Sequence, residues 1–315
     1  ELLATHQREV PELLAELQGI ASGCGLPFRI VLAVSLAEEL SYFAPVEMGL
    51  RANRSADHCS DYAFCTAAHC ADVHNEDGDL ADGKLFTGFV RLGASNFTVL
   101  NYAGDLLGGM SAMAFNSHGL AFSLNWVGPA SCDTRGLGRN FVSRLLLEAT
   151  SWEEAREVIS RRHAVGHNYQ LMDFRRRQIA NFEVAQEKVS ERRILEPFFH
   201  ANQYQTLEVP GQIINNSSSH RLARVAQLPK PQTPEDALRI LGDQEDRSYP
   251  IFHDNLSHAR GELSDWTLAS VLFDLDKGSV ELMAGNPASL KVQRRFLVPT
   301  GRPPSTGPRS KDVLI

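Results

Sequence analysis

The sequence lacks the long apolar run that a membrane-spanning helix needs. Its best candidate, residues 30–37, is short and is flanked by Arg29 and Glu38, whereas a spanning helix takes about 20 apolar residues. An excess of positive charge is missing too: the formal net charge is −7, and the only dense basic run covers residues 175–177. These absences argue against a membrane and against nucleic acid as partners.

Several signatures of catalysis and of disulfide scaffolds are also absent. The chain has no P-loop, no Gly-x-Gly-x-x-Gly fingerprint, no Gly-x-Ser-x-Gly elbow and no papain-type cysteine motif. Its five cysteines form an odd set without framework spacing, which favours reduced thiols and a cytoplasmic protein. A secreted protein stays open, because the chain begins at Glu1 and a signal could precede it, and because sequons occur at Asn53, Asn96, Asn215, Asn216 and Asn255.

What is present is a globular composition, with 43% apolar and 22% charged residues in 315. Amphipathic helices are predicted over residues 7–20 and 28–43, and the pattern changes to strands after residue 58. Elements then come in runs and not in strict βαβ alternation, which predicts an α+β layered sandwich. The predicted strands cover residues 60–66, 85–92, 97–102, 110–116, 120–125, 169–174, 179–184, 267–274 and 279–283, and further helices are predicted at 139–150, from 151 and from 234.

Cys59 stands where the helical part ends, after a polar segment (residues 51–57) that resembles an exposed linker. A cysteine attacks carbonyls as its thiolate and therefore needs a base. Eleven histidines do not single out one base. The α-amine of an N-terminal cysteine, with a pKa of ~7.7–8, is a well-matched alternative. Asp77 lies eighteen residues after Cys59, in an Asn-Glu-Asp-Gly segment that is also good turn chemistry.

A zinc site is the sharpest rival interpretation of the same cysteine. Three cysteines and one histidine loosely fit zinc-ligand spacing, namely Cys59, Cys65, Cys70 and His74. If residues 59–66 form one strand, its two cysteines share a face, and closing four ligands around one ion would break the strand. The zinc alternative is thus disfavoured but stays open.

Further motifs follow Cys59-Ser60 and His74-Asn75-Glu76-Asp77 in a fixed order: residues 116–126, 166–169, 200–204, 218–221 and 267–287. Together they resemble the N-terminal-nucleophile amidases, a group that includes the penicillin acyltransferase family (peptidase family C45), bile-salt hydrolases and acid ceramidase. The resemblance runs from about residue 19 to residue 297. Within it, the His-Asn-Glu-Asp-Gly form is most similar to the animal N-β-alanyl-dopamine (carcinine) hydrolases.

The resemblance implies a four-layer αββα sandwich and self-cleavage between His58 and Cys59. Residues 1–58 would be a helical pro-segment that stays as an associated subunit, and residues 59–300 the catalytic domain. The Pro/Ser/Gly-rich residues 301–315 are predicted to be a disordered tail. The family usually has glycine before the cysteine; the histidine found here keeps an uncleaved, binding-only relative open as an alternative.

The resemblance also assigns roles to five residues. Cys59 would supply the thiolate and the α-amine, and Asp77 would hold that amine. Asn125 and Asn168 would donate N–H groups to the oxyanion of the tetrahedral intermediate, and Arg221 would support the cysteine or a nearby carboxylate. Cys65 is excluded as the nucleophile, since its spacing to Asp77 fits poorly.

The implied activity is cleavage of a small-molecule amide through a thioester on Cys59, with no metal or organic cofactor. The implied substrates are β-alanyl amides of biogenic amines, such as β-alanyl-dopamine or carcinine. An acyltransferase of the same fold, which passes the acyl group to an amine, is the alternative. Homo-oligomerisation stays open.

Overall fold

The computed structural model describes residues 1–43, 59–79, 85–92, 95–103, 106–109, 111–254 and 265–300. Within these ranges, no helix combines the length and the apolar character that crossing a bilayer requires. The predicted cleavage residue His58 and the predicted tail, residues 301–315, lie outside the described residues.

Two antiparallel sheets form the centre of the molecule. The seven-stranded sheet is a meander in chain order, β3-β4-β5-β6-β7-β8-β9. The six-stranded sheet has the order β10-β1-β2-β11-β12-β13. The strands are β1 (Ser60–Cys65), β2 (Cys70–Asp79), β3 (Leu85–Leu92), β4 (Ser95–Tyr102), β5 (Ser111–Asn116), β6 (Leu120–Asn125), β7 (Gly166–Asp173), β8 (Gln178–Ala185), β9 (Lys188–Arg193), β10 (Phe198–His200), β11 (Asp265–Asp274), β12 (Ser279–Met283) and β13 (Val292–Leu297).

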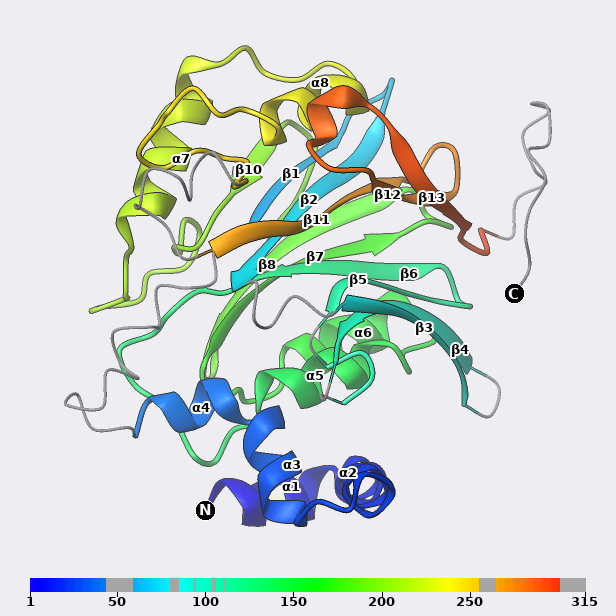
Figure 1. Ribbon diagram of the computed structural model, residues 1–315, viewed down its shortest axis with the longest axis vertical. Coiled ribbons are helices and arrows are strands. Elements are labelled where there is room, and N and C mark those ends of the chain that lie inside the picture. The colour runs from blue at the N-terminus through cyan, green and yellow to red at the C-terminus, as the bar shows by residue number, and fades with distance from the viewer. Residues whose placement is uncertain are drawn as a thin grey trace.

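Helices cover the outer face of each sheet, so the predicted αββα sandwich is confirmed (Figure 1). One apolar cluster joins α1–α3, α5 and α6 to the seven-stranded sheet, and another joins α7 and α8 to the six-stranded sheet. A third lies between the sheets. The helices are α1 (Leu2–Glu9), α2 (Pro11–Cys24), α3 (Phe28–Ser35), α4 (Ala37–Ser41), α5 (Arg139–Leu146), α6 (Trp152–Ile159), α7 (Asn216–Gln227) and α8 (Pro234–Leu241).

Helix ends follow local chemistry. Thr233 and Asp236 form a capping box at the start of α8, and Ser151 accepts a hydrogen bond from the Glu154 amide at the start of α6. The single helix predicted over residues 7–20 is wrong, because Val10 leaves the helical region (φ −146°, ψ 52°) and separates α1 from α2. The cause is Pro11, which disfavours helical backbone in the residue before it. The helix predicted over 28–43 is likewise divided, at Leu36.

The strand β2 was not expected. The segment from Asn75 to Gly78 has the composition of a turn, yet it lies inside β2, between β1 and β11. Register pairs Ser60 with Asn75. Pairing with β11, and at Asn75 also with β1, has overridden the local preference of these polar residues.

The cysteine pattern is corrected as well. Cys65 and Cys70 form a disulfide across the β1–β2 hairpin, while Cys24, Cys59 and Cys132 are not part of a disulfide. The expectation of uniformly reduced thiols is therefore wrong, and a cytoplasmic location loses that support. The structure also contradicts the disfavoured zinc alternative, because Cys65 and Cys70, two of its four candidate ligands, are bonded to each other.

The layer between the two sheets has an apolar half and a polar half. Residues two apart on a strand share a face, and the interior faces of β1, β2, β6, β7 and β8 change character along their length. The apolar half includes Ala63, Cys70, Ala121, Met172 and Ile179. The polar half consists of buried side chains on the same faces, namely Asp61, Asp72, His74, Glu76, Ser123, Asn125, Asn168, Gln170, Asn181 and Glu183.

Candidate active site

Cys59 lies at the start of β1, beside the polar half of the layer. It is buried, and its Sγ lies 4.0 Å from the main-chain oxygen of Asp77 on β2. The Arg221 guanidinium on α7 donates to the Cys59 carbonyl oxygen at 2.7 Å and to Ser60 Oγ at 2.7 Å. Arg221 also donates to Asn202 Oδ1 at 2.6 Å and is fully buried. Three predicted site residues, Cys59, Asp77 and Arg221, are thus brought together.

A histidine between two carboxylates lies next to the Cys59 thiol. His74 Nδ1 bonds Asp61 Oδ1 at 2.9 Å, and His74 Nε2 bonds Glu76 Oε2 at 3.0 Å. We call these three residues the His74 cluster. Cys59 Sγ, a ring nitrogen of His74 and a carboxylate oxygen of Glu76 all lie within 4.8 Å of one another. Such a trio has the donor types to hold a metal ion, although it differs from the predicted zinc set.

Electrostatics favour a charged His74. Burial opposes a charge on the ring, but the Asp61 and Glu76 carboxylates raise the pKa of His74 well above its ordinary value. In contrast, the neutral form is favoured at the neighbouring Asp72, because burial and the Asp61 carboxylate raise the pKa of the Asp72 carboxyl well above its ordinary value. The His74 cluster thus joins one imidazole to two acidic side chains, and an imidazolium can balance only one carboxylate charge.

Two hydroxyl groups from the opposite sheet hold these carboxylates. Tyr102 on β4 donates to Glu76 Oε1 at 2.6 Å. Ser123 on β6 lies 2.6 Å from Asp61 Oδ1 and 2.9 Å from Asp72 Oδ2. The carboxylates beside Cys59 are therefore fixed in position by both sheets.

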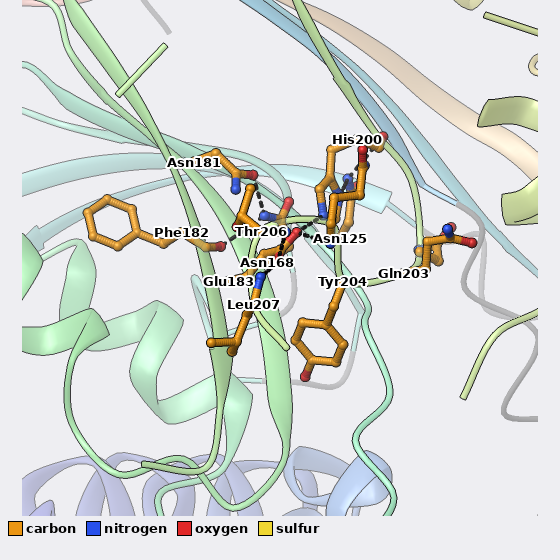
Figure 2. Close-up of polar contacts among 12 residues, drawn as sticks. Asn125, Asn168, Asn181, Phe182, Glu183, His200, Gln203, Tyr204, Thr206 and Leu207 are labelled. Carbon is orange, nitrogen blue, oxygen red and sulfur yellow. Dashed lines mark hydrogen bonds and ion pairs between the residues drawn. The ribbon is translucent and has the colours of Figure 1, made fainter. Parts of the chain in front are cut away.

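A second histidine lies on β10, in what we call the Asn125 cluster (Asn125, His200 and Glu183; Figure 2). Asn125 Nδ2 donates to His200 Nδ1 at 3.0 Å, and His200 Nε2 bonds Glu183 Oε1 at 3.1 Å. Asn125 Oδ1 is buried and has no hydrogen-bond partner in the described part of the chain. The opposite orientation of this amide would pair Oδ1 with Nδ1–H, so that both His200 ring nitrogens donate, and would turn Nδ2 to the other side.

Main-chain amides stabilise the Glu183 carboxylate. It accepts hydrogen bonds from the main-chain amides of Gln205, Thr206 and Leu207, at 2.7, 2.8 and 2.7 Å. Burial opposes its charge, yet the bond to His200 and these amides lower the pKa of Glu183 below its ordinary value.

Asn168 pairs with Asn125 across β6 and β7. Its Nδ2 donates to Asn181 Oδ1 at 2.6 Å and to the Phe182 carbonyl oxygen at 2.8 Å, as Figure 2 shows. Both amide hydrogens are committed in this conformation. The predicted oxyanion role of Asn168 stays a prediction, and it requires one of these bonds to be exchanged.

Residues 66–289 match the model of the family described as "Acyl-coenzyme A:6-aminopenicillanic acid acyl-transferase". The chain belongs to this penicillin acyltransferase family. The predicted family is therefore confirmed, and the matched residues include all of β2 and both histidine clusters except Asp61.

Two individual proteins are similar to this member of the penicillin acyltransferase family. The β-alanyl-dopamine/carcinine hydrolase of Drosophila melanogaster is 23% identical over 330 residues, covering 94% of this chain and 82% of that protein. A crystal structure of a mutant conjugated bile acid hydrolase from Clostridium perfringens is 12% identical, with a TM-score of 0.39, over 71% of this chain and 88% of that one.

Sequence reasoning missed the His74 cluster as a unit. It named His74 as part of a motif and as a zinc ligand, but Asp61 and Tyr102 carry no local signal. They reach the site only through β1–β2 pairing and through packing of one sheet on the other. His200 was noted within its motif, without its partner Glu183.

A cavity between the sheets lies beyond β2 in this penicillin acyltransferase family member. Ala269, which pairs with Glu76 across β2 and β11, is part of its wall. Most of the other lining residues are apolar, among them Leu85, Leu100, Phe252, Leu268 and Leu282. Cys59, His74 and Glu76 are not among the residues that line this cavity.

Proposed function

We propose that the chain is a self-processing cysteine amidohydrolase of the N-terminal-nucleophile type, which cleaves a small-molecule amide through a thioester on Cys59. The single observation that carries the proposal is the setting of Cys59. Cys59 is a buried cysteine outside any disulfide, just before the first residue of β1. Its carbonyl oxygen accepts a hydrogen bond from the buried Arg221, and its thiol lies near His74 and Glu76.

The proposed chemistry uses the new N-terminus. Cleavage of the peptide bond between His58 and Cys59 frees the α-amine, which takes the thiol proton. The thiolate attacks the amide carbon, the oxyanion is stabilised by a side-chain amide, and the amine leaves with the proton. We assign the oxyanion contact first to Asn125, in its alternative orientation, with Asn168 as the second donor and with Asp77 holding the α-amine. Water then hydrolyses the thioester.

The name of the Drosophila relative supports β-alanyl amides of biogenic amines as substrates. The family description favours the alternative, in which an acceptor amine takes the acyl group from the thioester in place of water. Product analysis with and without added amine separates the two. Hydrolysis unaffected by amine supports the hydrolase, whereas a new amide supports the acyltransferase.

We further propose that residues 1–58 remain bound after cleavage. Leu13, Leu14 and Leu17 of α2 pack into the cluster beneath the seven-stranded sheet. Polar contacts reinforce this packing: the Gly138 amide donates to His6 Nε2 at 2.9 Å, and the Arg139 amide to Glu39 Oε1 at 2.8 Å. Residues 59–300 then form the catalytic subunit.

The predicted cytoplasmic location remains to be tested together with the disulfide. A Cys65–Cys70 bond persists in an oxidising compartment. Cell fractionation combined with thiol labelling would therefore find the two cysteines reduced if the protein is cytoplasmic.

Intact-mass analysis tests the self-processing mechanism. We expect the purified protein to give two fragments divided at His58–Cys59, and Cys59→Ala to stay whole and inactive. Cys132→Ala is the matched control, since Cys132 is also a cysteine outside any disulfide, and this variant should be cleaved normally. A wild-type protein that is active while uncut would refute self-processing.

A further inference from the structure

The charge beside Cys59 points to the kind of acyl group that the site accepts. We propose that Glu76 is the specificity residue of the acyl pocket and that its carboxylate binds a primary ammonium group carried two methylenes from the scissile carbonyl. This inference rests on the proposed function, because it assumes that the acyl carbon is bonded to Cys59 Sγ.

Distance is the first argument. A Glu76 carboxylate oxygen lies within 4.8 Å of Cys59 Sγ. In a β-alanyl thioester, three bonds separate the ammonium nitrogen from the carbonyl carbon, a span of roughly 4 Å at ordinary bond lengths. The ammonium therefore reaches hydrogen-bonding distance of Glu76 when the acyl group is attached.

Unused bonding capacity is the second argument. Glu76 Oε1 accepts from Tyr102 and Oε2 from His74. An ionised carboxylate has about four acceptor sites, so each oxygen can accept one more hydrogen bond. The contacts already present fix the carboxylate in place, and such preorganisation lowers the cost of binding a cation.

Net charge is the third argument. His74 bonds two acidic side chains, Asp61 and Glu76, and a single imidazolium can balance only one carboxylate charge. Glu76 is only 5% exposed, so water does little to screen its charge. An ammonium group would neutralise it, whereas a neutral acyl chain of the same shape would leave it uncompensated.

The experiment compares the β-alanyl and propionyl amides of one amine, dopamine, because propionyl has the same length without the charge. The wild-type enzyme should prefer the β-alanyl amide. In Glu76→Gln, the ratio of the two kcat/KM values should fall about 30-fold, the equivalent of about 2 kcal/mol for a buried charge pair that loses one partner. Equal loss on both amides would overturn the proposal and leave Glu76 as a support for His74.

A second variant, Glu76→Asp, keeps the negative charge and tests the proposal even if Glu76→Gln fails to fold. Glu76→Asp draws the carboxylate back by one methylene. Its preference should shift from the β-alanyl amide toward the longer γ-aminobutyryl amide. An unchanged order of preference among cationic acyl chains would contradict direct contact between Glu76 and the ammonium.

Alkylation separates this inference from the proposed function. The Cys59 thiolate displaces bromide from 3-bromopropylammonium, forming a C–S bond as the C–Br bond breaks, and places an ammonium four bonds from sulfur, as the thioester does. Mass spectrometry should show faster labelling of Cys59 by this cation than by neutral 3-bromopropanol, with the rate ratio lost in Glu76→Gln. If the wild type is labelled faster by the cation than by the alcohol but hydrolyses no amide, only the proposed function fails. If wild type and Glu76→Gln give the same ratio of labelling rates, recognition of the cation by Glu76 fails.

Discussion

The two histidine clusters solve different electrostatic problems within one buried layer. His74 bonds two carboxylates, Asp61 and Glu76, through its two ring nitrogens. His200 bonds one carboxylate, and its other nitrogen meets the Asn125 amide. In the His74 cluster, the ring must be charged to hold two anions together. In the Asn125 cluster, Glu183 is already stabilised by three backbone amides.

This difference shows how one type of residue serves two purposes. An imidazolium is required where side-chain carboxylates face each other without backbone donors. Backbone N–H groups already stabilise the Glu183 carboxylate, so His200 can use its other ring nitrogen to orient the Asn125 amide. The first cluster is suited to setting charge beside Cys59, and the second to positioning Asn125.

The largest test of this comparison is removal of each ring. His74→Leu leaves Asp61 and Glu76 without their shared cation, and breaking a buried ion pair in this way costs roughly 3–5 kcal/mol. His200→Leu should cost less, about 1.5–3 kcal/mol for a hydrogen bond to a charged group. Urea unfolding measures both. Equal losses of free energy of unfolding would show that the two clusters are electrostatically alike.

The next test addresses catalysis. Asn125→Ala should lower kcat about 10²- to 10³-fold, the effect of one lost oxyanion donor of roughly 2.7–4 kcal/mol. Asn168→Ala is the matched variant on the paired position of β7, and its smaller loss should appear partly as lower stability, because Asn168 bonds Asn181 and Phe182. A larger kcat loss in Asn168→Ala would reverse the assignment of the first donor.

Stability against pH gives the smallest effect. The raised pKa of His74 means that its stabilisation is complete below the ordinary value of 6.5 and is lost as pH rises through the folded-state pKa. Above pH 6.5, wild type should therefore lose up to about 1.4 kcal/mol per pH unit relative to His74→Gln. Glu183 has the opposite sign: its pKa is lowered from 4.5, so its stabilisation is present above that value and is lost as pH falls.

A free energy of unfolding that runs parallel in wild type and His74→Gln from pH 6 to 9 would contradict a charged His74. Denaturation by urea at each pH provides the measurement. Glu183→Gln serves as the comparison at low pH, where wild type alone should weaken as the carboxylate takes up its proton.

Much of the layered fold could be predicted from apolar periodicity. The sequences of strands such as β3 and β6 either alternate between apolar and polar residues or are continuously apolar, and turn residues flank them. Their predicted bounds agree with the structure. The strand β2 could not be found this way, because its interior face carries Asp72, His74 and Glu76. In the sequence, a strand with buried polar residues has the same composition as an exposed segment. Only their partners, which lie far along the chain, reveal that they are inside.

The same limit applies to the site. An ordered set of motifs was enough to place Cys59, Asp77 and Arg221, and the structure brings these three together. Hydrogen bonds from Tyr102 and Ser123 cross from one sheet to the other. No spacing within one strand predicts such contacts, since they depend on how two sheets pack.

The packing of α1–α4 against the rest of the protein has a thermodynamic consequence. In a chain cut at Cys59, these helices are held only by contacts such as those of Leu17 and His6. Unfolding then becomes a dissociation into two chains, so the midpoint of thermal melting rises with protein concentration. The uncut Cys59→Ala protein would instead melt at one temperature at every dilution.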